Sequence, residues 1–201
     1  MSRSTLGTAA LCALASLGMT LAASAKAPNS GGHPWYFPDR GSQHYPPWHR
    51  DPSPLVEKVR RATAKYRDIN VALAEKWAPA TPCVSGPNEG AMGVHFVLGD
   101  RISDGNVDPE APEALIYEPM PSGAMRLVGV EFIVFAASWE SAHEGEGAPS
   151  LDGHLMNYVG APNRYGLDAF YELHVWAWEQ NPKGSFSDWN TRVTCDKQAG
   201  D

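Results

Sequence analysis

Two histidines and two glutamates lie in segments of this sequence that alternate apolar and polar residues. They are His95, Glu118, Glu131 and His174. Imidazole nitrogens and carboxylate oxygens are the groups that bind zinc, iron, manganese and copper in proteins. If the fold brings these side chains together, His95, Glu131 and His174 form a site for a divalent transition metal. Glu118 is then a fourth ligand or a hydrogen-bond partner of one of the ligands. An open coordination position on such a metal would allow hydrolytic or oxidative chemistry.

The segments that carry these residues are predicted to be strands, because their side chains alternate with a period of two. They are residues 92–98, 114–118, 126–135 and 171–178. In three of the four, the face opposite the His or Glu is the more uniformly aliphatic one. If the aliphatic faces pack on a helix, the other faces form a common concavity. The histidines and glutamates then converge in a curved antiparallel sheet or a small barrel.

The last predicted strand places aromatic side chains beside the candidate ligand. By alternation, Glu172, His174, Trp176 and Trp178 share one face. We expect Trp176 and Trp178, together with Phe135, to wall a ligand pocket, and Glu172 to have a supporting role. The alternative is a hydrogen-bonded His–Glu network that fixes the core or holds a small organic ligand without a metal. In that case the protein is a non-catalytic binding module.

A single amphipathic helix of about six turns is predicted from Leu55 to Trp77. Ser53 followed by Pro54 is typical of an N-cap and a first helical residue. Apolar residues recur every three or four positions, while basic residues occupy the other faces. A long helix followed by strands without intervening helices indicates an α+β domain, in which the helix packs on an antiparallel sheet.

Residues 1–25 are predicted to be a secretory signal peptide. Arg3 precedes an apolar run, and Ala23-Ser24-Ala25 has the small residues at which signal peptidase cuts, so cleavage is expected after Ala25. The run is too short for a comfortable membrane span, and no span is expected after its removal. These features predict a periplasmic or secreted protein.

Three zones follow the predicted signal peptide. Residues 26–52 are rich in proline, histidine and aromatic residues, which predicts an extended arm. Residues 53–197 are predicted to form a single α+β domain, and residues 198–201 a flexible tail. The arm leaves open a third function, in which the chain is an interaction protein of the cell envelope.

Cysteine content and charge narrow the class of protein further. Removal of the signal peptide leaves Cys83 and Cys195, for which a disulfide is expected in an oxidising compartment. Closing this loop would stabilise the fold by about 4 to 5 kcal/mol. The formal net charge is −7, and it becomes about −8 when Arg3 is removed. An acidic chain without a basic patch argues against nucleic-acid binding, so a metal ion or a small molecule is the expected partner.

Several short motifs of the predicted domain occur together in one known family. Within about residues 62–195, the chain resembles a family of exported bacterial proteins described only as hypothetical. This resemblance implies bacterial origin and export, and it implies no activity or cofactor. The motifs that carry it are Gly93-Val94-His95-Phe96, Tyr117-Glu118-Pro119, Gly129-Val130-Glu131-Phe132, Asn163-Arg164-Tyr165-Gly166-Leu167 and Glu172-Leu173-His174-Val175-Trp176-Ala177-Trp178.

Overall fold

A computed structural model describes residues 53–197 of the chain. The signal peptide, arm and tail predicted at 1–25, 26–52 and 198–201 lie outside these residues. The described chain combines an antiparallel sheet with short helices, as expected of an α+β domain. In chain order the elements are α1 (Pro54–Thr63), η2 (Ala64–Arg67), α2 (Ile69–Ala74), β1 (Ala78–Pro79), β2 (Val84–Gly86), β3 (Gly90–Val97), α3 (Gly99–Ile102), β4 (Ala114–Pro119), β5 (Met125–Phe135), α4 (Ala136–Ala142), β6 (Ser150–Leu151), β7 (His154–Leu155), β8 (Asn157–Val159) and β9 (Phe170–Val175).

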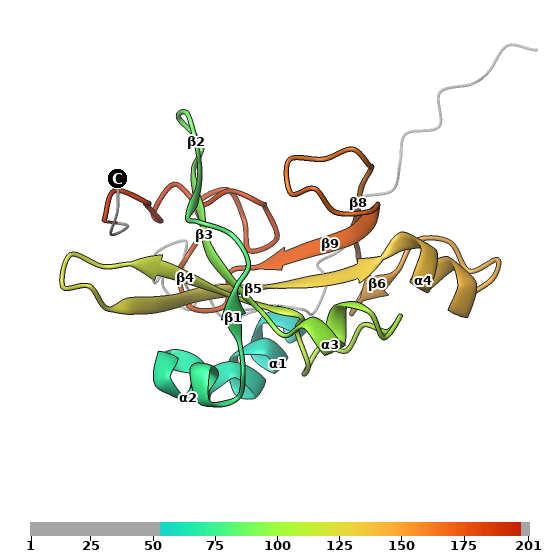
Figure 1. Cartoon of the computed structure of the whole chain (residues 1–201), viewed down its shortest axis with the longest axis horizontal. Coiled ribbons are helices and arrows are strands. Elements are labelled where there is room, and N and C mark those ends of the chain that lie inside the picture. The colour runs from blue at the N-terminus through green and yellow to red at the C-terminus, as the bar shows by residue number, and fades with distance from the viewer. Residues whose placement is uncertain (1–52, 198–201) are drawn as a thin grey trace, which may run out of the picture. The chain divides into compact units, whose positions relative to one another are not determined.

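The main sheet has the strand order β1-β3-β4-β5-β9-β8, and β2 also pairs with β3 (Figure 1). All of its pairings are antiparallel. Its strands follow an open path from β1 to β8, so the described residues form a sheet and not the barrel that was the other possibility. The longest strand, β5, pairs with β4 on one side and β9 on the other, and it therefore forms the centre of the sheet.

The prediction of one continuous helix from Leu55 to Trp77 is wrong, because the helical region is divided into α1, η2 and α2. The chain is extended at Asp68, whose φ is −92° and ψ is 108°, and the Asp68 side chain accepts a hydrogen bond from the backbone N–H of Asn70. Asp68 is thus the N-cap of a new helix and ends the previous one. Trp77 follows a left-handed residue, Lys76, after α2 has ended.

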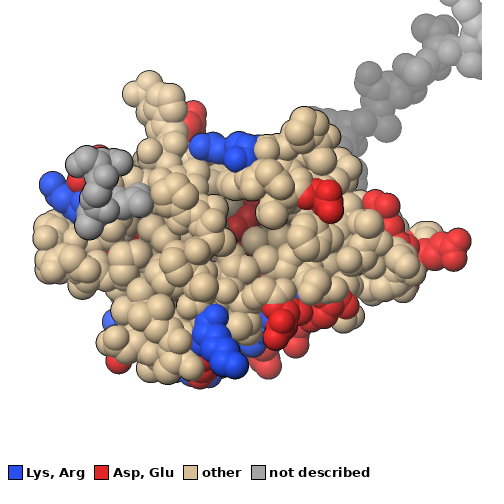
Figure 2. All heavy atoms as spheres, in the orientation of Figure 1, with Lys and Arg blue, Asp and Glu red and all other residues tan. Residues whose placement is uncertain are grey.

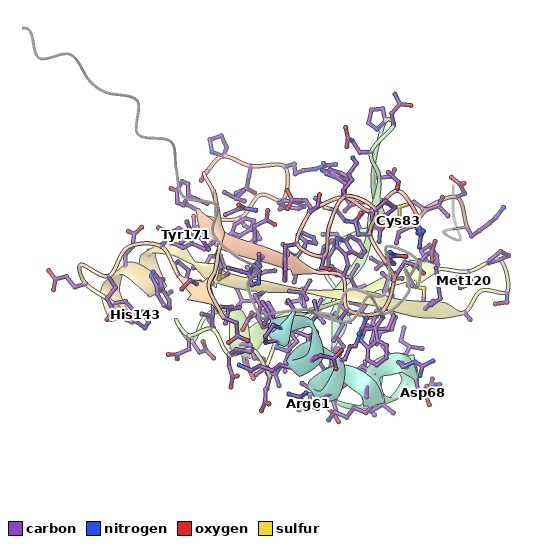
Figure 3. The ribbon with its side chains drawn as sticks, turned by 180° about the vertical axis from the view of Figure 1, so that it is seen from behind. Arg61, Asp68, Cys83, Met120, His143 and Tyr171 are labelled. Atoms are coloured by element: carbon purple, nitrogen blue, oxygen red, sulfur yellow. A yellow bond between two sulfur atoms is a disulfide. The ribbon has the colours of Figure 1, made fainter. Side chains whose placement is uncertain are left out.

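One face of the sheet forms the main core against the helices. Leu55 and Val59 of α1 are fully buried in a cluster with Phe96 of β3 and Phe132 of β5. On the opposite side of the helices, Arg61 is exposed and directed away from the sheet (Figure 3). The predicted role of the aliphatic strand faces is therefore correct. Within the described residues, no helix is both long enough and apolar enough to cross a membrane.

A bulge in the β4–β5 pairing changes the predicted face of one residue. Tyr117 pairs with Leu127 and Ile116 with Gly129, so Val128 is an extra residue in β5. Val128 consequently packs with Trp176 on the face away from the helices, and not with the aliphatic face to which simple alternation assigns it. Period-two alternation fails at such a position, because the extra residue shifts the parity of the strand.

The disulfide predicted between Cys83 and Cys195 is present, with the two Cα atoms 5.6 Å apart. It joins the segment before β2 to the segment that follows β9. The same C-terminal segment is also held by the sheet, because Ala91 and Asn190 exchange two backbone hydrogen bonds of 3.1 Å each. These links hold the end of the C-terminal segment, including Val193 and Cys195, against Val128 and Trp176 on the face of the sheet that the helices do not cover.

Candidate metal centre

Three of the four predicted ligands meet on the sheet face opposite the helices. Glu131 of β5 lies directly opposite His174 of β9. His95 of β3 reaches the same place above β4, where its Nε2 lies 3.2 Å from Glu131 Oε2. The two imidazole rings are perpendicular, with centroids 5.8 Å apart. One ligand atom from each of the three residues lies within 4.8 Å of the others.

The sequence of β4 makes this approach possible. β4 separates β3 from β5. A large side chain on the face of β4 that lies opposite the helices would therefore stand between His95 and Glu131. The residue opposite Glu131 on β4 is Ala114, which is fully buried and carries only a methyl group. Two ligands bound at about 2.1 Å to one ion lie at most about 4 Å apart, so small side-chain rotations would bring the three donor atoms into coordination distance.

The fourth predicted ligand, Glu118, does not belong to this centre. Its carboxylate accepts hydrogen bonds from the Arg126 guanidinium, at 3.1 Å from Nε, and from the backbone N–H of Thr194 at 3.0 Å. Strand parity predicted its face correctly, but it lies on β4 beyond Ile116, away from Ala114. Glu118 instead fastens the C-terminal segment to the β4–β5 hairpin.

Two further carboxylates approach His174 from its other side. Glu172 Oε2 lies 3.7 Å from His174 Nδ1, and Asp188 Oδ1 lies 3.8 Å from the same atom. Glu172 shares the face of His174, as predicted. It was expected to have only a supporting role, but its carboxylate lies close enough to His174 to be a further ligand. Asp188 was missed because it lies in the irregular segment after β9, where no strand periodicity points to a face. Two groups of three potential ligands thus share His174: the first contains His95 and Glu131, and the second contains Glu172 and Asp188.

His174 has no hydrogen-bond partner, although its side chain is only 1% exposed. Neither Nδ1 nor Nε2 makes a hydrogen bond. Burial, together with a smaller effect of the nearby His95, lowers the pKa of His174 to about 3. Burial also lowers the pKa of His95 to about 4. Both imidazoles are therefore neutral near pH 7, which is the form that binds metals.

The carboxylates of the centre are also perturbed by burial and crowding. Burial raises the pKa of Glu131 well above its ordinary value, and the hydrogen bond with Glu172 raises it further. Burial likewise raises the pKa of Glu172 and of Asp188. Burial therefore drives both His95 and Glu131, which are in short contact, toward their neutral forms. Without a cation, burial and crowding favour the protonated form of the carboxyl groups of the centre.

The three predicted aromatic wall residues have different positions. Trp176 is buried beside His174, with ring centroids 6.3 Å apart, and its indole N–H donates to the carbonyl of Ser187. Trp178 lies after the end of β9 and faces the helices, where its indole N–H donates to Thr63 Oγ1 at 3.0 Å. Trp178 is therefore not part of the centre. Phe135 packs in a neighbouring cluster that includes Ala114 and Phe170.

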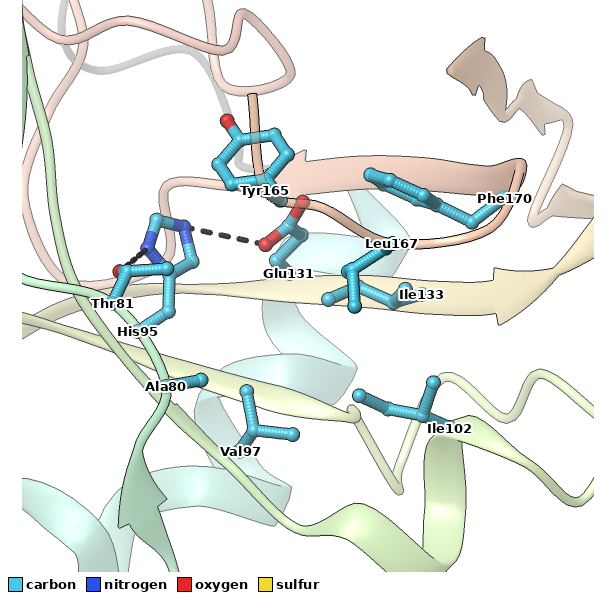
Figure 4. A pocket seen from close by; sticks show the side chains of 10 residues that line it. All are labelled: Ala80, Thr81, His95, Val97, Ile102, Glu131, Ile133, Tyr165, Leu167 and Phe170. Atoms are coloured by element: carbon cyan, nitrogen blue, oxygen red, sulfur yellow. Dashed lines mark hydrogen bonds and ion pairs between the residues drawn. The ribbon is translucent and has the colours of Figure 1, made fainter. Parts of the chain in front are cut away.

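A cavity of about 140 Å³ adjoins the centre, and His95 and Glu131 form part of its wall. Figure 4 shows this polar end, together with Thr81, whose Oγ1 lies 3.4 Å from His95 Nδ1. The remaining wall is mainly apolar. Figure 2 shows a hollow in the middle of one face of the molecule, with acidic atoms at its floor. The residues that line the cavity are Ala80, Thr81, His95, Val97, Ile102, Glu131, Ile133, Tyr165, Leu167 and Phe170.

Comparison of the chain with protein-family models, with curated proteins and with solved structures found no match.

Proposed function

We propose that this protein binds a divalent transition metal ion through His95, Glu131 and His174, with Glu172 and Asp188 as further ligands. The observation that carries the proposal is the unpartnered imidazole of His174. A buried polar group without a hydrogen bond costs about 1 to 3 kcal/mol, and such groups are rare in folded proteins. A metal ion accepts the lone pair of one ring nitrogen of a neutral imidazole and removes the part of this cost that belongs to that nitrogen.

The rival interpretation is a hydrogen-bonded core network without a metal. It accounts for His95, which contacts Glu131 and Thr81. It does not account for His174, because a network that fixes the core satisfies its buried members. Carboxylates lie near His174 at 3.7 and 3.8 Å, beyond hydrogen-bonding distance. Such distances leave room for an ion between the groups.

The charge of the centre also favours a cation. Three carboxyl groups gather around two neutral imidazoles, and they repel one another when ionised. A divalent ion would replace the protons that these groups hold and offset their negative charge. Mixed imidazole and carboxylate ligands suit zinc, iron, manganese or copper better than calcium or magnesium. An ion with an open coordination position would activate water or polarise a bound oxygen.

Metal analysis of the purified, tag-free protein tests the proposal. We expect a stoichiometric ion, and a rise in the unfolding temperature when zinc is added to protein that has been stripped with a chelator. His174→Leu should abolish both effects. It should also leave the metal-free protein at least as stable as the wild type, because it removes an unpartnered polar group and keeps most of the side-chain volume.

His154→Ala is the matched control, because His154 lies outside the centre and packs on Phe186. This variant should retain the metal and its effect on unfolding. His95→Leu should lose the metal and also destabilise the metal-free protein, since it removes the partner of Glu131. A His174→Leu protein that keeps its metal, or a wild type that binds none of the four ions, would contradict the proposal.

A further inference from the structure

The cavity beside the metal centre has a polar end and an apolar end. His95 and Glu131 lie at the polar end, next to Thr81 (Figure 4). Ile133, Leu167 and Phe170 enclose the apolar end. Since two of the proposed metal ligands are also wall residues, a molecule in the cavity would have one end next to the ion.

The size of the cavity limits its occupant to about one ring. Its volume is about 140 Å³, and an apolar cavity of about 150 Å³ in another protein binds benzene. Phe170 and Tyr165 offer aromatic surfaces to such a ring, with centroids 6.2 Å apart and planes inclined at 63°. Aromatic rings prefer inclined or offset neighbours of this kind.

The wall also determines the chemistry of the polar end of the occupant. No Lys or Arg is among the described residues that line the cavity, so no side chain balances an anionic group there. The hydroxyl group of Tyr165 contacts Met92 Sδ at 3.7 Å. Arg164 lies over the ring of the wall residue Tyr165, 5.8 Å from its centroid, and does not itself line the cavity. An ion held by His95, Glu131 and His174 would be in direct contact with the polar end, so an oxygen anion in the cavity would bind tightly only when that ion is present.

We propose that the cavity binds a small amphipathic molecule, a single aromatic ring with one oxygen substituent, such as a phenol or a benzoate. The ring lies between Ile133, Leu167 and Phe170, and the oxygen coordinates the ion. This inference rests on the proposed metal binding. It defines the class of ligand, and it makes the presence of the ion necessary for tight binding.

Cobalt-substituted protein provides the test, because the visible absorption of Co²⁺ changes when a ligand enters its coordination shell. Phenol and benzoate are titrated into the cobalt protein, and toluene is the control that has the ring without the oxygen. We expect saturable spectral changes with phenol or benzoate and none with toluene. Zinc protein should bind the same probe, and metal-free protein should bind it at least tenfold more weakly, as measured by calorimetry.

Two variants test whether the probe occupies this cavity. Ala80→Phe and Leu167→Trp add bulk to the cavity from different segments of the wall, and both residues are exposed enough for the fold to tolerate the change. Each should raise the Kd of the probe at least tenfold while the cobalt content stays the same. Ala142→Phe is the matched control on an exposed position of α4, and its Kd should equal that of the wild type.

The outcomes separate this inference from the proposal on which it rests. Protein that binds no cobalt or zinc overturns both. Protein that binds the ion but shows no spectral change with phenol or benzoate overturns the ligand assignment alone. Probe binding that survives metal removal at full affinity, or that both filling variants leave unchanged, also overturns it.

Discussion

Glu113 shows how strongly a single buried carboxyl group is perturbed outside the metal centre. It precedes β4, it is 2% exposed, and its Oε2 accepts a hydrogen bond of 2.9 Å from the backbone N–H of Ile133. β4 begins at Ala114, so the side chain of Glu113 takes the place of the next backbone acceptor for β5. Burial raises the pKa of Glu113 to about 8.

This shift predicts a pH-dependent loss of stability. The folded-state pKa lies above the ordinary value of 4.5, so the folded protein retains a proton that the unfolded chain loses. The stabilising contribution of that proton is complete below about pH 4.5, and it declines as the pH rises toward 8. Glu113→Gln keeps an acceptor for Ile133 and does not titrate. The free energy of unfolding of this variant should therefore exceed that of the wild type by a margin that grows by roughly 3 to 4 kcal/mol from pH 5 to 8.

Urea unfolding at a series of pH values, with a chelator present, measures this difference. The chelator removes the contribution of any bound ion. Subtracting the unfolding free energies of the two proteins cancels the titration of the groups that they share. A difference that stays constant from pH 5 to 8 would show that Glu113 is ionised in the folded state.

For individual residues, the sequence identified the residue types of the centre but not all of its members. His95, Glu131 and His174 could be predicted because each lies in a strand whose alternation is clear. Asp188 could not, because it lies in irregular structure, and long-range links such as those made by Asn190 and Cys195 bring it to His174. His174 has no hydrogen-bond partner because of the residues that surround it in the fold. This cannot be read from the sequence.

Among the secondary-structure elements, the strand faces were easier to predict than positions along the strands. Alternation gave the correct face for His95, Glu131 and Glu118. It could not show that Glu118 lies too far along β4, since the pairing register depends on contacts between strands. The bulge at Val128 and the break at Asp68 have the same origin, because each is a local departure from a regular period.

The close approach of β3 to the C-terminal segment predicts that a larger residue at Gly90 destabilises the fold. Gly90 has a φ of +88°, and a Cβ atom there would lie 2.1 Å from the carbonyl oxygen of Asn190. Gly90→Ala should disrupt the hydrogen bonds between Ala91 and Asn190 and loosen the segment that carries Asp188. We expect a stability loss of about 3 kcal/mol or more, with weaker zinc binding.

Gly123→Ala is the matched control for this prediction. Gly123 has a φ of +78°, but no atom lies within 4 Å of its added Cβ. Its substitution should cost only the backbone strain of about 1 to 2 kcal/mol and leave the Kd for zinc unchanged. Thermal unfolding and zinc titration distinguish the two variants. Equal losses in both would exclude the contact with Asn190 as the cause.

For the molecule as a whole, the disulfide is the main constraint on the C-terminal segment. It joins residues 112 positions apart and closes most of the described chain into one loop. Replacing both cysteines by alanine should lower the free energy of unfolding by up to about 4 to 5 kcal/mol, because the unfolded chain gains conformational entropy. The Kd for zinc should rise as well, since residues 176–195 become less well held.

Urea unfolding and zinc titration of the double variant measure these effects. The wild-type protein under reducing conditions is the control, and its midpoint should match that of the variant. Matching midpoints for the oxidised wild type and the double variant would mean that the backbone links at Ala91 hold the segment without the disulfide. An equal Kd for zinc in the wild type and the double variant would show that metal binding does not depend on the disulfide.

The burial of the metal centre determines how quickly an ion can be exchanged. His95, Glu131 and His174 are all at most 6% exposed, whereas Asp188, on the segment that crosses this face, is only partly buried. An ion bound at this candidate centre would reach solvent through the cavity lined by His95 and Glu131, or when the segment that carries Asp188 opens locally. Such a narrow exit would slow exchange, so the ion acquired first would persist even when a competing ion later became more abundant.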